Sequence, residues 1–419
     1  MGVRARGAGR RRARGRRRIA RRLSLGVLLA VLAAGWAVAL YFLWQTDVPG
    51  HRPSVDEAVL FTPAELDKAE DYERFVRWLF VATELVLLAV VAAYTRWGAR
   101  FMRESAAGRI GTGMLLAMLG LGIQWLVLLP FGIAELWWQR RHGISKVPYV
   151  DWIFQSWFAL GSGFLFICLA ILIVMGLAGP LRDWWWIPGG AVFVGLALLF
   201  TFIYPYLLGG QKSLRDPDLA AQADEYEREL GLPHIPVRVQ PVGTETTSPN
   251  AEAVGLGPSR RVVLWDTLLD GRFSNEEEGV VVAHELAHHA RNHLWKGIAW
   301  YALFAFPGAF VIARVTRRRG GMRNPEAVPL SLLLLVLLGL IALPIQNLFT
   351  RHLEAEADWS AFELTEDPDA AKGLFEGFTT TAFADPTPPT WAYVFMETHP
   401  TILQRIELAE EWEEEQGQR

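Results

Sequence analysis

Seven long apolar stretches constrain the fold of this chain more than any other feature of its sequence. A helix rises about 1.5 Å per residue, so about 20 apolar residues cross roughly 30 Å of hydrocarbon. We therefore predict seven membrane spans. The sixth is short and contains Pro307, so a re-entrant segment is an alternative there. The predicted spans are Leu23 to Trp44, Phe75 to Tyr94, Gly111 to Ile133, Ile153 to Leu177, Trp184 to Leu207, Gly297 to Ala313 and Pro329 to Pro344.

Composition agrees with a membrane location. The 419 residues are 52% hydrophobic and include 18 Trp, and aromatic residues of this kind are enriched at membrane interfaces. The chain is long enough for a membrane domain and a soluble domain of ordinary size. Its single cysteine, Cys168, lies in an apolar run, which excludes a disulfide framework and a cysteine metal site.

Soluble segments alternate with the spans. We divide the chain into an Arg-rich tail (1–22), a membrane domain of five spans (23–208), a soluble segment (209–296), two further spans (297–345) and a second soluble segment (346–419). A soluble site must therefore be assembled from both soluble segments. Hydrophobic periodicity predicts helices at 220–230, 276–292 and 346–364, a strand in "IPVRVQPV", and a strand running into a helix in "RRVVLWDTLLD".

The run "HELAHHARNH" carries the chemistry of the first soluble segment. His284 and His288 are four residues apart, so both imidazoles share one helical face and can reach one metal ion. Zinc lowers the pKa of a bound water to about 7, and Glu285 can accept the proton as general base. This is the logic of the HExxH motif of zinc metallopeptidases, and it predicts one Zn²⁺ per chain.

A catalytic zinc usually has three protein ligands, and the run "TRHLEAEAD" supplies the third. Glu354 is the predicted ligand, and Asp358, one turn later, is expected to accept the free ring N–H of a ligating histidine. Glu356 points about 200° away from Glu354 on a helix, so it is not expected to bind the metal. Three nearby histidines are interpreted as packing, helix-end or surface residues: His289, His293 and His352. His293 is also a candidate for supporting a metal ligand from behind.

These motifs resemble the type I CaaX prenyl protease family of membrane zinc metallopeptidases. The resemblance runs from about Phe61 to Trp412 and rests on "NAEAVGLGPSRRVVLWDTLL", "HELAHHARNH", "TRHLEAEAD" and "THPTILQRI", in the family's order. Ala287 replaces the glycine common in the family, which a helix tolerates. The resemblance implies a zinc endopeptidase facing a membrane-enclosed cavity, with Asn250 near a strand that pairs with substrate, and His399 and Arg405 near the site. His399 and Arg405 are therefore catalytic candidates, expected to help zinc to stabilise the oxyanion that forms from the scissile carbonyl.

The predicted fold class is therefore mainly α: a multi-pass helical membrane protein with a small α+β zinc metallopeptidase domain assembled from two soluble segments. Its expected partners are the lipid bilayer and a membrane-associated polypeptide, and its expected location is the cell membrane. The Arg-rich start abuts a span and lacks interleaved aromatic residues, which argues against nucleic-acid binding. It is expected to be a solvated tail or a patch for anionic lipid.

Charge predicts the orientation. Cytoplasmic loops are enriched in Lys and Arg. If the N-terminus is inside, 21 basic residues lie inside and six lie in the two short outer loops, which puts the zinc domain outside. Eukaryotic members of the family present this domain to the cytosol, so charge and resemblance disagree.

Two alternatives to CaaX processing remain open. One is a membrane-protein quality-control protease of the same chemistry. The other is a transporter or scaffold with a structural zinc centre, for which Glu84 and Glu135 are the acidic candidates in or beside the spans. Structural zinc sites are usually closed by four protein ligands, and a glutamate next to a ligand histidine serves no purpose there.

Overall fold

The computed structural model describes residues 34–417 except 47, 51–52, 99 and 101–106. The chain divides into two units, 1–45 and 46–419. In the first unit, Ala34–Leu43 forms an apolar helix. The rest of the first predicted span, from Leu23 to residue 33, lies outside the described residues.

Among the described residues of the second unit, six long helices are apolar enough to cross a membrane. They contain the other six predicted spans, except that the fifth was predicted to begin at Trp184, two residues before its helix. Proline interrupts most of them without ending them, since membrane helices re-satisfy the freed backbone groups locally. Helix α9 runs through Pro307, so the sixth span is a continuous helix rather than a re-entrant segment. The helices are α3 (Pro63–Trp97), α4 (Gly108–Arg141), α5 (Tyr149–Leu181), α6 (Trp186–Leu207), α9 (His293–Thr316) and α10 (Val328–Thr365).

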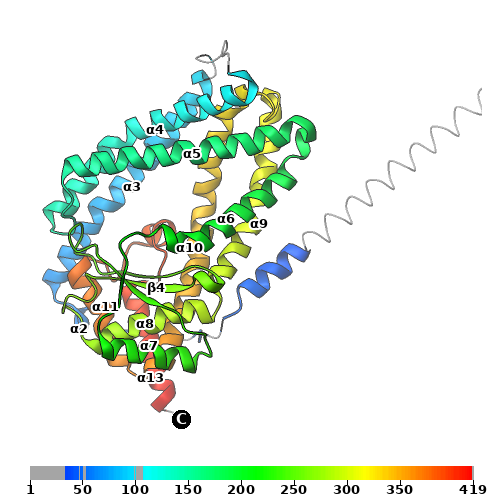
Figure 1. Ribbon diagram of the computed structural model, residues 1–419. Helices are drawn as coiled ribbons and strands as arrows, with labels where there is room; N and C mark the ends of the chain where they lie inside the picture. Colours follow the sequence, from blue (N-terminus) through cyan, green and yellow to red (C-terminus); the bar gives the residue numbers. More distant parts are fainter. Residues whose placement is uncertain (1–33, 47, 51–52, 99, 101–106, 418–419) are drawn as a thin grey trace, which may run out of the picture. The chain divides into compact units, whose positions relative to one another are not determined.

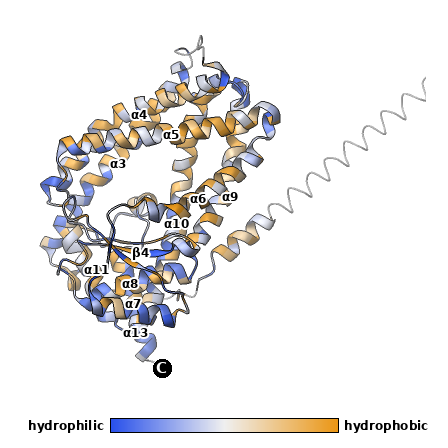
Figure 2. Cartoon of the chain, in the orientation of Figure 1, coloured by the Kyte–Doolittle hydropathy of each residue, from blue (hydrophilic) through white to orange (hydrophobic). Residues whose placement is uncertain are grey.

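The polar elements of this unit gather at one end of the long helices (Figure 1). Figure 2 shows apolar residues along α4, α5, α6 and α9 and more polar ones in this lower region. One apolar core joins its sheet to all of its helices except α12, so the two soluble segments form one domain. Its helices are α2 (Glu57–Leu60), α7 (Pro217–Glu229), α8 (Asn275–Ala290), α11 (Pro368–Ala382), α12 (Thr390–Phe395) and α13 (Ile402–Gly417).

A four-stranded sheet covers one side of α8. Its strands are β1 (Lys212–Ser213), β2 (Val237–Gln240), β3 (Ala251–Val254) and β4 (Arg261–Trp265), in the order β1-β2-β4-β3. β2 and β4 are parallel, whereas β1 pairs with β2 and β3 pairs with β4 in antiparallel fashion. β3 therefore lies at an edge of the sheet.

The helix predicted directly after β4 is wrong, because residues 266–270 form turns. Side chains there satisfy other backbone groups instead of starting a helix. Asp266 accepts hydrogen bonds from the backbone N–H groups of Val242 and Gly243, and Thr267 donates to the carbonyl of Ser248. Short polar side chains compete with helix formation in this way.

Helix α10 continues without a break from its membrane part into the soluble domain. The predicted boundary at 345/346 falls inside this helix, next to Pro344. The same rigid element therefore crosses the apolar region and carries Glu354 and Asp358 into the core of the soluble domain.

Gly255, at the end of β3, is expected to tolerate no side chain. Its φ is +86°, and a Cβ would collide with the carbonyl oxygen of Ser259. We expect Gly255→Ala to lower the free energy of unfolding by about 2 kcal/mol or more, from left-handed backbone strain and overpacking. Gly257→Ala is the control, since φ is +55° there and a Cβ meets open space. Thermal unfolding in detergent measures the stability of both variants. Equal losses of stability in Gly255→Ala and Gly257→Ala would contradict the predicted collision.

Candidate metal centre

Helix α8 carries the first two metal-ligand candidates. A capping box starts this helix: Ser274 accepts from the N–H of Glu277, whose carboxylate accepts from the N–H of Ser274. The middle of α8 is buried on all sides, because its apolar residues from Val280 to Ala283 follow one another around the helix in the core. His284 and His288 lie one turn apart, and their Nε2 atoms are 3.0 Å apart.

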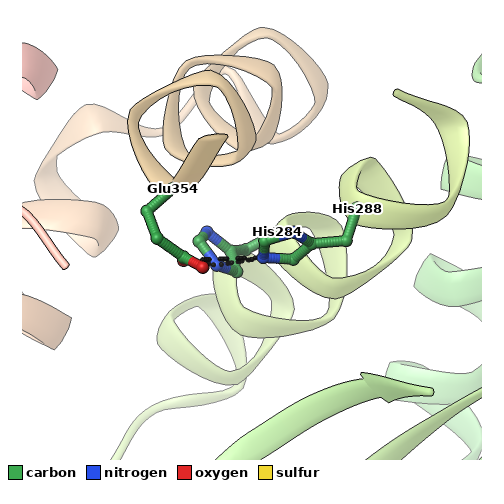
Figure 3. Close-up of side chains that lie close together, drawn as sticks. All are labelled: His284, His288 and Glu354. Atoms are coloured by element: carbon green, nitrogen blue, oxygen red, sulfur yellow. Dashed lines mark hydrogen bonds and ion pairs between the residues drawn. The ribbon is translucent and has the colours of Figure 1, made fainter. Parts of the chain in front are cut away.

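Helix α10 brings Glu354 against this pair (Figure 3). Its Oε2 lies 3.2 Å from His284 Nε2 and 3.5 Å from His288 Nε2. A tetrahedral zinc with bonds of about 2.0–2.1 Å holds its ligand atoms about 3.3 Å apart. Two imidazole nitrogens and a carboxylate oxygen at these distances therefore fit one ion and leave one coordination position open.

The outer nitrogen of His284 faces Asp358. His284 Nδ1 and Asp358 Oδ1 are 2.9 Å apart. Arg405, from α13, donates to both oxygens of Asp358, Nε to Oδ2 at 2.8 Å and a terminal nitrogen to Oδ1 at 2.6 Å. The Asp358 side chain is 1% exposed, and its carboxylate raises the pKa of the Arg405 guanidinium against the effect of burial. Arg405 therefore balances the charge of Asp358.

The field around His284 favours a cation. Burial lowers the pKa of its imidazole, but the carboxylates of Asp358 and Glu354 outweigh burial and raise that pKa to about 10. The same two carboxylates attract a metal ion at this position, so a metal and a proton compete for His284.

The outer nitrogen of His288 faces His293. Their Nδ1 atoms are 2.8 Å apart, and His293 Nε2 lies 3.0 Å from Glu356 Oε2. Lys296 donates to the same oxygen at 2.7 Å. Glu356 does not face the metal ligands, in keeping with its helical direction. The sequence reasoning missed its contact with His293 and missed Lys296, although Lys296 follows His293 by one helical turn.

A cleft of about 300 Å³ opens beside the metal cluster and is lined by Glu285, Asn250 and His399. His399 Nε2 lies 3.2 Å from Glu354 Oε2, and the His399 side chain is half exposed. Strand β3 runs beside Glu285. Burial raises the pKa of Glu252 on this strand, and the negative charge of the nearby Glu285 carboxylate raises it further. Arg405 also borders the cleft, with its guanidinium directed at Asp358.

The other two histidines named in the sequence analysis, His289 and His352, are not part of the three-residue cluster. His289 is buried and contacts the carbonyl of Arg261 at 3.2 Å. Burial lowers its pKa to about 4, so at pH 7 it is a neutral packing residue. His352 contacts the hydroxyl of Thr46 at 3.2 Å.

A second His/carboxylate group lies at the surface on and after α7, formed by Asp224, Glu227 and His234. Glu227 accepts the N–H of Ile235 at 2.7 Å and contacts His234 Nδ1 at 3.1 Å. These contacts give the group a structural role, because they hold the loop after α7 against that helix.

Comparisons with known proteins agree with this geometry. A model of peptidase family M48 matches residues 213–413. The part of the chain that carries His284, His288 and Glu354 is therefore similar to peptidase family M48. It is 26% identical over 417 residues to "Uncharacterized metalloprotease YhfN" of Bacillus subtilis, covering 91% of this chain and 97% of that protein. It is also 26% identical over 293 residues to "CAAX prenyl protease 1 homolog" of Arabidopsis thaliana, covering 64% of this chain and 66% of that protein.

Among solved structures, Ste24p of S. mikatae matches with a TM-score of 0.66 at 18% identity, covering 90% of this chain and 96% of that one. The predicted fold class and the resemblance to type I CaaX prenyl proteases are confirmed. The chain is an integral membrane metallopeptidase, and its family implies a metal cofactor. A transporter or scaffold with a structural zinc centre is not favoured.

The Asp358–Arg405 pair yields a stability prediction. Arg405→Met leaves a buried carboxylate without its cation, and breaking a buried ion pair in this way costs about 3–5 kcal/mol. Arg74→Met is the control, because Arg74 is 57% exposed where it pairs with Glu70 and exposed pairs contribute under about 1 kcal/mol. Denaturant unfolding in detergent measures both, and similar losses would show that Arg405 does not stabilise Asp358.

Proposed function

We propose that this chain is a zinc-dependent endopeptidase in which His284, His288 and Glu354 hold one Zn²⁺ and Glu285 is the general base. The observation that carries the proposal is the cluster of three ligand atoms at 3.0–3.5 Å, beside a cleft that Glu285 lines. When bound, zinc supplies a Lewis acid that activates water and polarises the scissile carbonyl.

Glu285 follows His284 directly and lines the cleft, and it is not one of the three residues of the ligand cluster. In this proposal Glu285 accepts a proton from the attacking water and then delivers it to the leaving amine. Asp358 holds the outer nitrogen of His284 and so orients that imidazole, as carboxylates behind ligand histidines do. Arg405 keeps Asp358 charged and fixed. This role is a positioning one, and it replaces the direct catalytic role expected for Arg405 from the sequence.

We further propose that substrate adds to strand β3 as an extended chain. β3 is the sheet edge nearest the cleft and has no strand on its outer side among the described residues. An unpaired edge offers backbone N–H and C=O groups to a peptide. Asn250 and Ala251 line the cleft at the start of this edge, so they would contact substrate. His399 is half exposed in the same cleft and lies 3.2 Å from Glu354 through its Nε2, so it can donate a hydrogen bond to the carbonyl oxygen as charge develops there.

The substrate class we propose is a membrane-associated or lipidated polypeptide. Two relatives carry the name CAAX prenyl protease 1 homolog. A second, largely apolar cavity of about 510 Å³ lies among α5, α6, α9 and α10, with Trp300, Phe304 and Leu335 in its lining. Its position among the membrane helices suits a hydrocarbon chain. Proteolysis of unmodified membrane proteins is the alternative, and it requires no occupant in this cavity.

Glu285→Gln tests the chemistry. Removing a general base typically costs about 10²–10⁴-fold in kcat, while the metal ligands stay in place. We therefore expect about one zinc per chain in both proteins and loss of cleavage in the variant. Glu276→Gln, an exposed change in the first turn of α8, is the control and is expected to keep full activity. Zinc content and peptide cleavage are measured on protein purified in detergent.

The substrates in this assay are unfolded casein and one CaaX peptide, with and without its farnesyl group. Preference for the farnesylated peptide would support CaaX processing, and cleavage of casein with no farnesyl dependence would support the alternative. Absence of zinc from the wild-type protein, or full activity in Glu285→Gln, would overturn the proposed chemistry.

For orientation, we propose that the metallopeptidase domain lies on the outer side of the cell membrane. Arg317 pairs with Asp183 at 2.8 Å, and Arg319 donates to the carbonyl of Thr95 at 2.9 Å. These contacts join the connection between α5 and α6, the connection after α9 and the last turn of α3, at the end of α9 remote from His293. Lys and Arg concentrate on the cytoplasmic side, which supports an inner location for this end.

Sided labelling tests the orientation. In a Cys168→Ser background, Glu276→Cys marks the metallopeptidase domain and Arg318→Cys marks the basic end. We expect a membrane-impermeant maleimide to label the first in intact cells and the second only after the cells are opened. The reverse pattern would put the active site in the cytosol.

A further inference from the structure

The hydrogen bonds behind His288 decide which of its nitrogens can bind a metal. Glu356 Oε2 faces two nitrogens, His293 Nε2 at 3.0 Å and Lys296 Nζ at 2.7 Å. A carboxylate only accepts hydrogen bonds, so His293 Nε2 must carry its hydrogen. In a neutral imidazole the other nitrogen is then an acceptor.

The same reasoning about which nitrogen carries a hydrogen assigns the contact between His293 and His288. His293 Nδ1 lies 2.8 Å from His288 Nδ1, and one hydrogen is shared between them. Since His293 Nδ1 accepts, His288 Nδ1 donates. His288 Nε2 is left with its lone pair, and this atom faces His284 Nε2 and Glu354 Oε2. The tautomer of His288 is the one a metal ligand requires.

We propose that Glu356 and Lys296 are positioning residues that set the tautomer and orientation of His288 through His293. This inference rests on the proposed function in one respect, that His288 is a metal ligand. We call the series His288, His293, Glu356 and Lys296 the His288 relay.

The His288 relay has a counterpart behind the other histidine. His284 Nδ1 faces Asp358, and Arg405 holds that carboxylate. In both cases a carboxylate of α10 backs a histidine of α8, and a cation holds the carboxylate. Asp358 reaches its histidine directly, whereas Glu356 faces α9 and needs His293 as an intermediate.

The chain turn after α8 makes this intermediate possible. α8 ends at Ala290, and Asn292 adopts a left-handed conformation with φ +58°. The turn starts α9 with His293 stacked edge-on against His288, with ring centroids 4.9 Å apart. Lys296 follows one turn later on the same face of α9.

Burial separates this role from a surface contact. The side chains of His293 and Glu356 are 4% and 6% exposed. Water therefore does not replace a lost partner easily, and a change in Glu356 must be transmitted to His293. Helix packing alone would explain a buried apolar residue at position 356, but not a carboxylate that accepts from two donors.

Paired substitutions at position 356 test the proposal. Glu356→Gln keeps an oxygen that can accept from both His293 and Lys296, and Glu356→Met keeps similar length without an acceptor. Loss of a partner behind a ligand histidine typically lowers metal affinity roughly 10–100-fold. We expect Glu356→Met to weaken zinc binding by this amount and Glu356→Gln to stay within about threefold of wild type. Lys296→Met should fall between them.

Metal affinity is measured on metal-depleted protein by competition with a chelator, and the cobalt-substituted proteins are compared by their visible spectra. The spectrum of Glu356→Met should change and that of Glu356→Gln should not. Glu363→Met is the control, because the Glu363 side chain is 51% exposed on the same helix and pairs with Arg291. Thermal unfolding is recorded for every variant to separate affinity from folding.

Each outcome decides the proposal. Wild-type zinc affinity and an unchanged cobalt spectrum in Glu356→Met overturn it, as does equal weakening in the Gln and Met variants. If Glu356→Met does not fold, Lys296→Met with unchanged affinity and spectrum overturns it. If wild-type protein binds no metal, the proposed function fails together with this inference; if it binds zinc and only the relay variants behave as wild type, this inference alone fails.

Discussion

The packing of α10 against α8 is the constraint on which the rest of the structure depends. α8 carries two histidines one turn apart, and the carboxylates of α10 complete the ligand set and hold the His284 imidazole. Because α10 is one continuous helix from the membrane region into the soluble domain, the position of Glu354 is tied to the packing of the spans. The core around both helices includes Leu286, Phe362 and Ile406, all fully buried, and it holds the register between them.

Close packing of this kind carries charges into the protein interior, and each needs a partner. Arg405 holds Asp358, and Lys296 holds Glu356. Buried pairs are weak contributors to net stability because desolvation offsets their attraction. Their value here is geometric, since each fixes the position of a carboxylate that touches a histidine. The soluble domain therefore gives up some hydrophobic packing in its centre to orient its imidazoles.

Much of this arrangement could be predicted from the sequence, for identifiable reasons. Apolar runs report membrane spans directly, because lipid requires them, and the spacings within "HELAHHARNH" and "TRHLEAEAD" report shared helical faces. The helix expected after β4 failed because Asp266 and Thr267 bond to backbone groups more than 18 residues away in the chain. The contacts of Glu356 and Lys296 were missed for a similar reason. They depend on the left-handed turn at Asn292, and spacing along one helix carries no information about how the next helix packs.

Charge balance gives a further reason for the donor set at the centre of the domain. Four buried carboxylates lie at this site, on α8 and α10: Glu285, Glu354, Glu356 and Asp358. The cations in contact with them are Arg405 and Lys296. With neutral imidazoles the group is two positive charges short, and a divalent ion supplies that difference. Protonation of His284 offsets only one charge, so a metal site of this composition is electrostatically complete with the ion and incomplete with the proton.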